Sequence, residues 1–395
     1  MVEYILATRN RRVPRSFIRE ILKVAGDPDI ISFAGGLPNA SLFPVRELRK
    51  AVNDLFDSRG ADPLQYAASE GFGPLREWVC QRYKKRFGLE YSPENVLITT
   101  GSQQALDLAG KVFLEDGRSA VMERPGYLGA IQAFSLFTDR IIQVPMEDDG
   151  FDLNLFEGAL RRGSAGVVYL ISNFQNPSGA SYSLEKREAV ARICEEYGVP
   201  LLEDDPYGEL RFSGEDLRPV TSFMESGGVL LGTFSKIGVP GFRIGWMTAE
   251  SEILDSLIVV KQAADLHTSA FDQQVAWQYL ENEDIDKHIQ DVRELYGRHC
   301  DLMISLIEEH FPAQVRYTRP DGGMFLWITL PDGCSSLELF EAAVRQKVAF
   351  VPGTPFHADG GGENTMRLNF SNADERSIEE GIRRLGKCIK EYLGK

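Results

Sequence analysis

GVLLGTFSKIGVPGFRIGWMT, residues 228–248, contains two short apolar runs separated by a polar, glycine-rich segment. Similar runs recur from Asn95 onward, and stretches with a helical period separate most of them; these runs are NVLITT, SAVMER, RIIQVP, GVVYLI and VPLLED. Short continuous runs of Val, Ile and Leu are typical of strands that helices cover on both faces. The pattern therefore predicts an α/β fold built on a mostly parallel sheet.

Polar residues follow several of these runs, at the points where the predicted strands end. Sheets of this kind bind ligands outside the carboxyl ends of their strands, so these residues are candidates for function. Gly101-Ser102-Gln103 precedes a helical stretch at 103–113, where backbone N–H groups and the positive helix end favour a phosphate. From this segment alone, an ordinary serine N-cap is the simpler interpretation.

A chain of 395 residues is longer than the chains that usually fold around a single hydrophobic core. We therefore expect two domains that follow an N-terminal arm. The arm comprises residues 1–30, and apolar spacing at 15–24 predicts a short amphipathic helix there. A large domain with the sheet occupies residues 31–285. Residues 286–395 form a smaller α+β domain that ends in a helix at 374–393.

Charge and composition exclude several functional classes. The chain has 58 Asp and Glu against 43 Lys and Arg, and a net charge of -15 repels nucleic-acid phosphates and anionic membranes. No apolar segment has the length of a membrane span, and the N-terminus lacks the apolar stretch of a secretory signal. Five cysteines and five histidines show no metal-ligand spacing. We therefore expect a cytoplasmic protein with free thiols and no metal.

Lys236 is the candidate for covalent chemistry. It follows the apolar run 228–233 and has hydroxyls at Thr233 and Ser235 and a guanidinium at Arg243 nearby. A lone lysine in a glycine-containing turn is usually a solvated surface residue, but a lysine beside phosphate-binding groups at a strand end suits imine formation. Arg243 has the fork geometry that binds phosphate, and the alternative for it is a structural ion pair.

Asp204 ends the next apolar run upstream, where a carboxylate can keep a pyridine nitrogen protonated. Glu203 and Asp205 are rival candidates, and three adjacent acids taken alone are more often a solvated turn. Strand alternation places Asp204 on the opposite face from both neighbours. Tyr207 and Asn176 are in positions from which they can reach a ring hydroxyl, although Asn176 before Pro177 also suits a turn.

Taken together, these segments resemble the fold-type I pyridoxal-phosphate aminotransferases over nearly the whole chain. Within that group the sequence is most similar to the 2-aminoadipate aminotransferases of the lysine-biosynthetic type. The matching segments are SFIREIL, ISFAGGLPN, LQYAASEG, LITTGSQQALDL, FQNPSG, EDDPYGEL, GTFSKIGVPGFRIG, KQAADLHT, RYTRPDGGMF, VAFVPG and GGENTMRLNFS. The resemblance implies an aspartate aminotransferase-like large domain with a mostly parallel seven-stranded sheet covered by helices.

The resemblance also implies the cofactor, pyridoxal 5′-phosphate, and the residues that hold it. Lys236 would carry it as a Schiff base, Asp204 would pair with the pyridine nitrogen, and Tyr207 and Asn176 would contact the ring oxygen. Tyr127 would stack on the ring. The phosphate would be held by Ser102, Gln103, Thr233 or Ser235, and Arg243.

Further residues are implied for the substrate and the dimer. Arg367 matches the family arginine that grips the α-carboxylate through two parallel hydrogen bonds, and Gly36 would offer backbone contacts beside Asn176. Arg19 in the arm corresponds to a residue linked to side-chain recognition. Tyr66 resembles the tyrosine that reaches the neighbouring subunit's phosphate, which implies a homodimer with shared active sites.

These residues predict a two-stage amino-group transfer. An L-amino acid such as 2-aminoadipate, glutamate or one of a broad aliphatic and aromatic set displaces Lys236, and the freed lysine moves the α-proton as a base. A 2-oxo acid leaves, and a second one such as 2-oxoglutarate reverses the sequence, so we expect ping-pong kinetics.

Two alternatives remain at this stage. A lyase or decarboxylase would use the same cofactor residues. A non-enzymatic effector domain is disfavoured, because the family match begins near residue 16 and leaves no room for an N-terminal DNA-binding segment.

Overall fold

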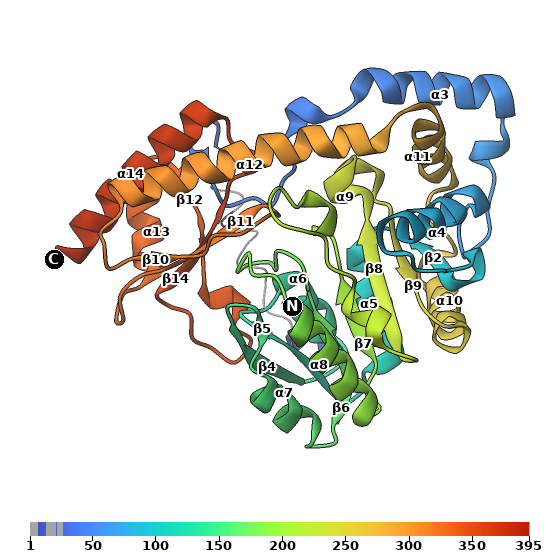
Figure 1. Cartoon of the computed structure of the whole chain (residues 1–395), viewed down its shortest axis with the longest axis horizontal. Coiled ribbons are helices and arrows are strands. Elements are labelled where there is room, and N and C mark those ends of the chain that lie inside the picture. Colours follow the sequence, from blue (N-terminus) through green and yellow to red (C-terminus); the bar gives the residue numbers. More distant parts are fainter. Residues whose placement is uncertain (1–6, 13–20, 22–26, 395) are drawn as a thin grey trace, which may run out of the picture.

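The computed structural model describes residues 7–12, 21 and 27–394. The helix expected at 15–24 lies outside the described residues except for Ile21, which is buried. A four-residue helix, α1 (Arg9–Arg12), precedes it. The rest of the chain forms a large sheet with its helices and, beside it, a smaller sheet with three further helices (Figure 1).

The large sheet has eight strands, and seven of them correspond to the seven apolar runs in the sequence. The eighth, β5, has two residues and extends the edge beside β4 beyond the seven strands expected. Strand β9 is antiparallel to both neighbours and β5 to β4, whereas the other pairings are parallel. The order is β2 (Val96–Thr99), β9 (Gly245–Thr248), β8 (Gly228–Thr233), β7 (Leu201–Asp204), β6 (Ala165–Leu170), β3 (Ser119–Arg124), β4 (Arg140–Glu147) and β5 (Gly150–Phe151).

Both faces of this sheet are covered, as the continuous apolar runs predict. Val121 and Val168 belong to one buried cluster, whereas the adjacent Met122 and Tyr169 belong to another. This alternation follows from the two-residue period of a strand. The helices of this part are α3 (Val45–Arg59), α4 (Gly73–Phe87), α5 (Ser102–Phe113), α6 (Leu128–Phe134), α7 (Leu153–Leu160), α8 (Leu184–Glu196), α9 (Phe234–Ile237), α10 (Ser251–Asp265) and α11 (Ala270–Asn282).

Short 3-10 turns connect many of these elements. They are η1 (Ala40–Leu42), η2 (Asp62–Leu64), η3 (Pro93–Asn95), η4 (Gly208–Leu210), η5 (Val220–Phe223), η6 (Pro240–Phe242) and η7 (Thr354–Phe356). Two of them matter for the site, because η4 directly follows Tyr207 and η6 directly precedes Arg243.

The smaller part is built on an antiparallel sheet in the order β10 (Arg316–Tyr317), β11 (Phe325–Thr329), β14 (Thr365–Asn369) and β13 (Val351–Pro352). Its helices are α12 (Ile285–His310), α13 (Ser336–Arg345) and α14 (Glu375–Leu393), and α14 corresponds to the helix expected at 374–393. Figure 1 shows α12 running from the neighbourhood of α11 to α14, so this helix spans both parts.

The start of the predicted large domain pairs with the smaller part. Strand β1 (Ile31–Ser32) is parallel to β12 (Val348–Ala349), and the N–H of Phe33 donates to the carbonyl of Ala349. The adjacent segment with Gly36 is therefore held against the C-terminal part of the chain. The domain boundaries themselves stay a prediction.

Candidate functional site

A cavity of about 520 Å³ lies where the chain leaves β7 and β8. It brings together residues far apart in the sequence. Among the predicted site residues, those that line it are Gly36, Ser102, Gln103, Tyr127, Asn176, Asp204, Tyr207, Thr233, Ser235, Lys236, Arg243 and Arg367. Tyr66 is absent from its walls, and Arg19 lies outside the described residues.

Lys236 lies in α9, the short helix that follows β8. The Thr233 hydroxyl caps this helix by accepting from the N–H of Ser235 (3.1 Å), which fixes where the lysine leaves the strand. Lys236 Nζ donates to the carbonyl oxygen of Gly36 (2.8 Å). Burial lowers the pKa of Lys236 to about 8, and the positive charges of Arg367 and Arg243 act in the same direction. The amine is therefore neutral often enough near neutral pH to act as a nucleophile.

Asp204 ends β7 and is one of the residues that line the cavity. Its Oδ2 accepts from the Tyr169 hydroxyl (3.0 Å), whereas Oδ1 is buried and has no hydrogen-bond partner among the described residues. Burial raises the pKa of Asp204 to about 7. A cationic N–H donor placed at Oδ1 would restore the ionised form, because an adjacent positive charge stabilises a carboxylate.

The two acids beside Asp204 serve other contacts, in line with the expected alternation of faces. Glu203 accepts from the Ser172 hydroxyl and from the N–H of Thr221 (2.9 Å) on the opposite side of β7. Asp205 accepts from the side chain of Asn173 (2.9 Å) and from a backbone N–H in the turn that follows. Asp204 alone of the three acids lines the cavity.

Arg243 packs directly over the start of α5. Gly101 has a φ of 74°, and a Cβ at this position would lie 2.5 Å from Arg243 Nη2. Only glycine allows both this backbone conformation and this approach. Arg243 itself is in the left-handed region at a φ of 53°, directly after η6.

Hydroxyl and N–H groups surround that guanidinium. Ser102 Oγ is buried and without a partner among the described residues, and Arg243 Nη1 donates to Ser235 Oγ (3.4 Å). Thr233 Oγ1 instead lies 3.2 Å from the carbonyl oxygen of Ile244. The N-terminus of α5, two hydroxyls and a guanidinium thus form a cradle that suits a phosphate group.

Arg367 belongs to β14, and its side chain lines the cavity. Its Nη1 donates to Asn176 Oδ1 and its Nη2 to the carbonyl oxygen of Ala34, both at 2.8 Å, while Nε has no partner among the described residues. The guanidinium lies 4.2 Å from the centre of the Phe325 ring. Burial lowers the pKa of Arg367 to about 10, so the group stays charged and retains donors for an anion.

Two tyrosines contribute neutral phenols. Tyr207 OH accepts from Asn176 Nδ2 (3.5 Å), and Tyr127 lies at the N-terminus of α6. Burial raises the pKa of Tyr127 to about 12 and also raises that of Tyr207. Both side chains therefore carry a proton at working pH, which they can donate to an oxygen.

Tyr66 lies apart from this cavity on the surface, where its side chain is 82% exposed. Its ring meets the His267 ring edge-on at 5.8 Å, and the N–H of Ala67 donates to His267 Nε2 (3.3 Å). Tyr66 is therefore an exposed side chain that contacts His267 and takes no part in the lining of this cavity.

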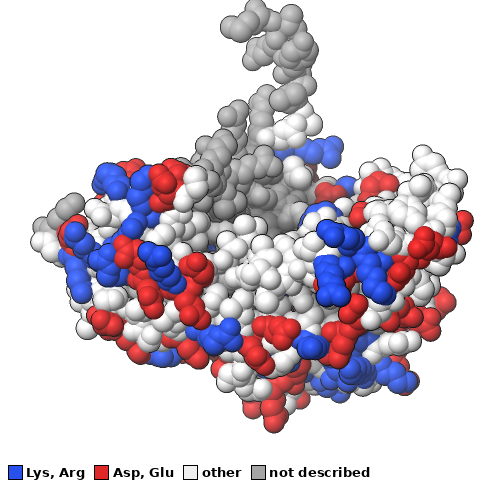
Figure 2. All heavy atoms as spheres, turned by 90° about the horizontal axis from the view of Figure 1, so that it is seen from above, with Lys and Arg blue, Asp and Glu red and all other residues white. Residues whose placement is uncertain are grey.

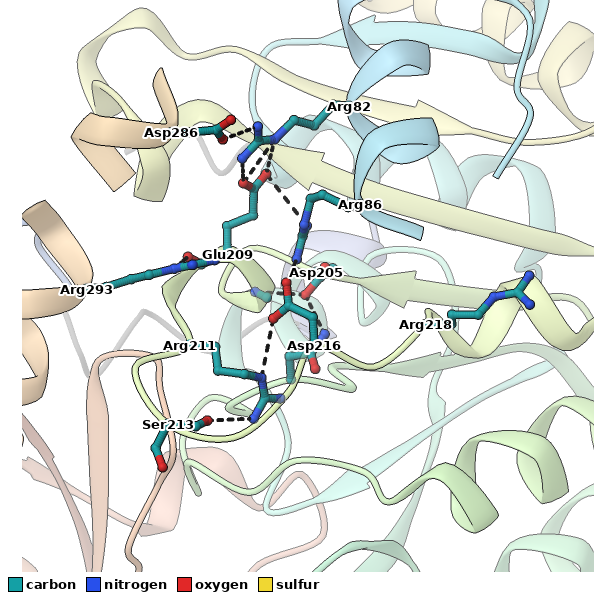
Figure 3. Close-up of polar contacts among 12 residues, drawn as sticks. Arg82, Arg86, Asp205, Glu209, Arg211, Ser213, Asp216, Arg218, Asp286 and Arg293 are labelled. Carbon is teal, nitrogen blue, oxygen red and sulfur yellow. Dashed lines mark hydrogen bonds and ion pairs between the residues drawn. The ribbon is translucent and has the colours of Figure 1, made fainter. Parts of the chain in front are cut away.

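A cluster of ion pairs surrounds Glu209, two residues after Tyr207 (Figure 3). Glu209 in η4 forms an ion pair with Arg82 of α4, and Arg82 also pairs with Asp286 at the start of α12. Arg293 Nε donates to the carbonyl oxygen of Glu209 (2.8 Å). These contacts connect three elements at the turn that positions Tyr207.

Several residues at or near the site were not predicted from the sequence, Tyr169 and Phe325 among them. Tyr169, the partner of Asp204, and Phe325, which stacks on Arg367, both lie within apolar strand runs and look like core residues. The signal available for Tyr169 is a single hydroxyl in the otherwise aliphatic run GVVYLI, because a buried tyrosine hydroxyl usually needs a partner.

Other site types find no support among the residues that the structure describes. No group of three or more Asp, Glu, His or Cys side chains there is arranged to hold a metal ion. In the same residues, no helix combines the length and apolar character needed to cross a membrane. On the face seen in Figure 2, acidic and basic side chains are intermixed along the edges.

Comparison with known proteins identifies the family. Residues 28–385 match the family described as aminotransferase class I and II. The chain is 42% identical to aromatic-amino-acid aminotransferase 1 of Thermococcus litoralis, with 96% of this chain and 93% of that protein covered. It is 43% identical to 2-aminoadipate transaminase of Thermus thermophilus, with 97% and 96% covered.

A solved structure agrees with this result. The kynurenine aminotransferase of Pyrococcus horikoshii in complex with PMP is 42% identical, covers 98% of both chains and superposes with a TM-score of 0.94. The sequence, the fold and the lysine-containing cavity thus lead to the same conclusion. The chain belongs to the class I and II aminotransferase family and is an aminotransferase.

Proposed function

We propose that this aminotransferase binds pyridoxal 5′-phosphate on Lys236 and transfers the amino group of an L-amino acid to a 2-oxo acid such as 2-oxoglutarate. Members of its family use this cofactor. The observation that carries the proposal is the shared cavity of the buried Lys236 amine and the unpartnered Asp204 Oδ1. One group suits a Schiff base and the other suits a protonated ring nitrogen.

The residues present fit the cofactor group by group. Ser102 Oγ, Ser235 Oγ and Arg243 offer donors to a phosphate, and the Thr233 hydroxyl, with its contact to Ile244, is the weaker candidate. Asp204 Oδ1, which has no partner among the described residues, would accept from the N–H of the ring nitrogen. Tyr207 and Asn176 contact each other and would bind the ring oxygen, and Tyr127 of the same cavity would stack on the ring.

The chemistry is divided between cofactor and protein. When bound, pyridoxal phosphate supplies an aldehyde that condenses with amines and a ring that accepts electrons. Lys236 would act as the base, because the lowered pKa of its amine leaves Nζ able to accept the proton from the substrate α-carbon. Asp204 remains ionised as long as it faces a cation, and its Oδ1 keeps the ring nitrogen protonated.

Arg367 binds the α-carboxylate of the substrate in this proposal. Its Nη atoms are fixed by Asn176 and Ala34, so the guanidinium is oriented before a substrate arrives. Two parallel hydrogen bonds to a carboxylate give the strongest and most directional contact available to an arginine. Asn176 then borders both the ring and the substrate.

A broad donor set fits the space beside this contact. A second cavity of about 780 Å³ shares Leu128 and Gln132 with the first, and apolar side chains such as Ile131 and Ile141 line much of it. Apolar walls favour aliphatic and aromatic side chains. The similarity to a 2-aminoadipate transaminase and to an aromatic-amino-acid aminotransferase supports donors of both kinds. Arg19 remains the proposed contact for a distal carboxylate.

We further propose a homodimer in which Tyr66 completes the neighbour's phosphate site. Its side chain is exposed and does not line the cavity of its own chain. Leu64, two residues before it, and Leu266, next to its ring partner His267, are also exposed large apolar residues. Exposed apolar residues that gather in this way mark a protein–protein contact.

A donor panel tests the proposal. We expect 2-aminoadipate, glutamate, leucine, phenylalanine or tyrosine to yield a 2-oxo acid and an equal amount of new glutamate from 2-oxoglutarate; with glutamate as donor, isotope exchange reports transfer. Ping-pong kinetics follow from the two half-reactions. Release of ammonia or carbon dioxide in place of the new amino acid would show a lyase or decarboxylase. Arg19→Ala should weaken acidic donors selectively.

A further inference from the structure

Lys261 of α10 is a fully buried cation with no role in the chemistry above. Its side chain has 0% exposure, and its Nζ donates to Gln104 Oε1 (3.0 Å), Asp265 Oδ1 (2.8 Å) and Thr268 Oγ1 (3.1 Å). Burial lowers the pKa of Lys261, while Asp265 counteracts that effect. Burying an ammonium group is costly unless it is paired and hydrogen-bonded, so this arrangement is specific.

The partners of Lys261 lie on both sides of the phosphate cradle. Gln104, in the first turn of α5, accepts from the N–H of Thr100 (2.8 Å) and donates to Asp265 Oδ2 (2.6 Å). The Thr100 hydroxyl also donates to Asp265 Oδ2 (3.0 Å). The Lys261–Asp265 pair thus holds Thr100 and Gln104, the residues that flank the segment 101–103. Between them lies Ser102, whose buried Oγ has no partner among the described residues.

We propose that Lys261 is a positioning residue for the cofactor phosphate, which it serves by fixing the first turn of α5. The inference rests on the proposed function, because it assigns the phosphate to that cradle. A helix N-terminus binds a phosphate well only when several N–H groups converge on it. Lys261 holds Gln104 and, through it, Thr100 in place. The N–H groups between these two residues and the Ser102 hydroxyl therefore stay directed at one point, where the phosphate would bind.

A comparable lysine–aspartate pair on α5 shows what distinguishes the Lys261–Asp265 pair of α10. Lys111 Nζ contacts Asp107 Oδ2 (2.6 Å) at the other end of α5, also four residues apart, but both side chains are about one-third exposed. Exposed pairs of this kind contribute little. The Lys111–Asp107 pair therefore provides a matched control, because it has the same four-residue spacing and lies on α5 itself but away from the cradle.

The test compares two aldehydes that differ only in the phosphate. Apoprotein carrying Lys261→Met should bind pyridoxal phosphate about tenfold more weakly, the loss of about one hydrogen bond to a charged group, and pyridoxal as tightly as wild type does. Lys111→Met should change neither affinity. In the ³¹P spectrum of bound cofactor, Lys261→Met should raise the pKa of the phosphate monoanion, because diverging N–H groups favour the dianion less.

The remaining outcomes separate this inference from the proposed function. Equal losses for both aldehydes, or none, with an unchanged ³¹P titration would overturn the inference alone. Wild-type apoprotein that binds neither aldehyde would overturn both proposals. If Lys261→Met fails to fold, Asp265→Asn keeps the size of the partner and should show the same phosphate-selective loss, and Lys261→Arg should restore part of the affinity. A loss in Asp265→Asn that is equal for both aldehydes would again overturn the inference.

Discussion

Replacing Arg367 by lysine keeps a positive charge in the cavity and removes the planar fork. The arginine already gives one donor to Asn176 and one to Ala34 and still has donors left for a carboxylate, among them the unpartnered Nε. A lysine ammonium has three donors, too few to keep both protein contacts and form two bonds to a substrate. At least one bond to the α-carboxylate is therefore lost.

The size of the effect follows from that single bond. A hydrogen bond to a charged group contributes about 1.5–3 kcal/mol, so kcat/KM for amino acid donors should fall by roughly 10- to 150-fold. The assay follows the first half-reaction by cofactor absorbance over a series of donor concentrations. Arg319→Lys is the control, because Arg319 is an exposed arginine that also lies over an aromatic ring, that of Tyr317, outside the cavity. A kcat/KM equal to that of wild type in Arg367→Lys would refute the assignment.

Three further predictions concern the pKa of the lysine, the partner of the aspartate and the ion cluster. Stopped-flow absorbance should show cofactor loading of apoprotein accelerating as the pH rises through about 8, because the pKa of Lys236 is lowered to about 8 and only its neutral form attacks; a pH-independent rate would contradict this. Tyr169→Phe removes the hydroxyl that lowers the pKa of Asp204, so that pKa should rise and steady-state kcat should fall about tenfold with KM for the amino acid unchanged; an unaltered kcat would exclude this role. Glu209→Ala removes one ion-pair partner of the buried Arg82 guanidinium and should lower the free energy of unfolding, measured by urea titration, by about 3 kcal/mol. An unchanged urea midpoint would show that the ion cluster does not stabilise the fold.

The sheet was predictable because its strands are buried on both faces. Each apolar run, such as the one that became β6, carries a continuous signal that solvent exposure does not interrupt. The two-residue strand β5 is too short for such a signal. The direction of β9 relative to its neighbours was not predictable either, because pairing depends on contacts distant in the sequence.

The site was predictable only in part, and the reason is geometric. Residues that follow strands, such as Asp204 and Lys236, could be identified because strand ends meet at one edge of a sheet. Arg367 lies 191 residues beyond its partner Asn176, and only the family resemblance connected them. Tyr169 was missed because a strand tyrosine has the pattern of a core residue until its hydroxyl partner is known. The arm residue Arg19 lies outside the described residues.

The central claim is that the amine at position 236 carries the cofactor, and borohydride trapping tests it most directly. Protein incubated with pyridoxal phosphate is reduced, digested and mapped by mass spectrometry. The phosphopyridoxyl group should appear on the peptide that contains Lys236 and on no other. A label on a different lysine, or an unlabelled Lys236 peptide after saturating cofactor, would contradict the account.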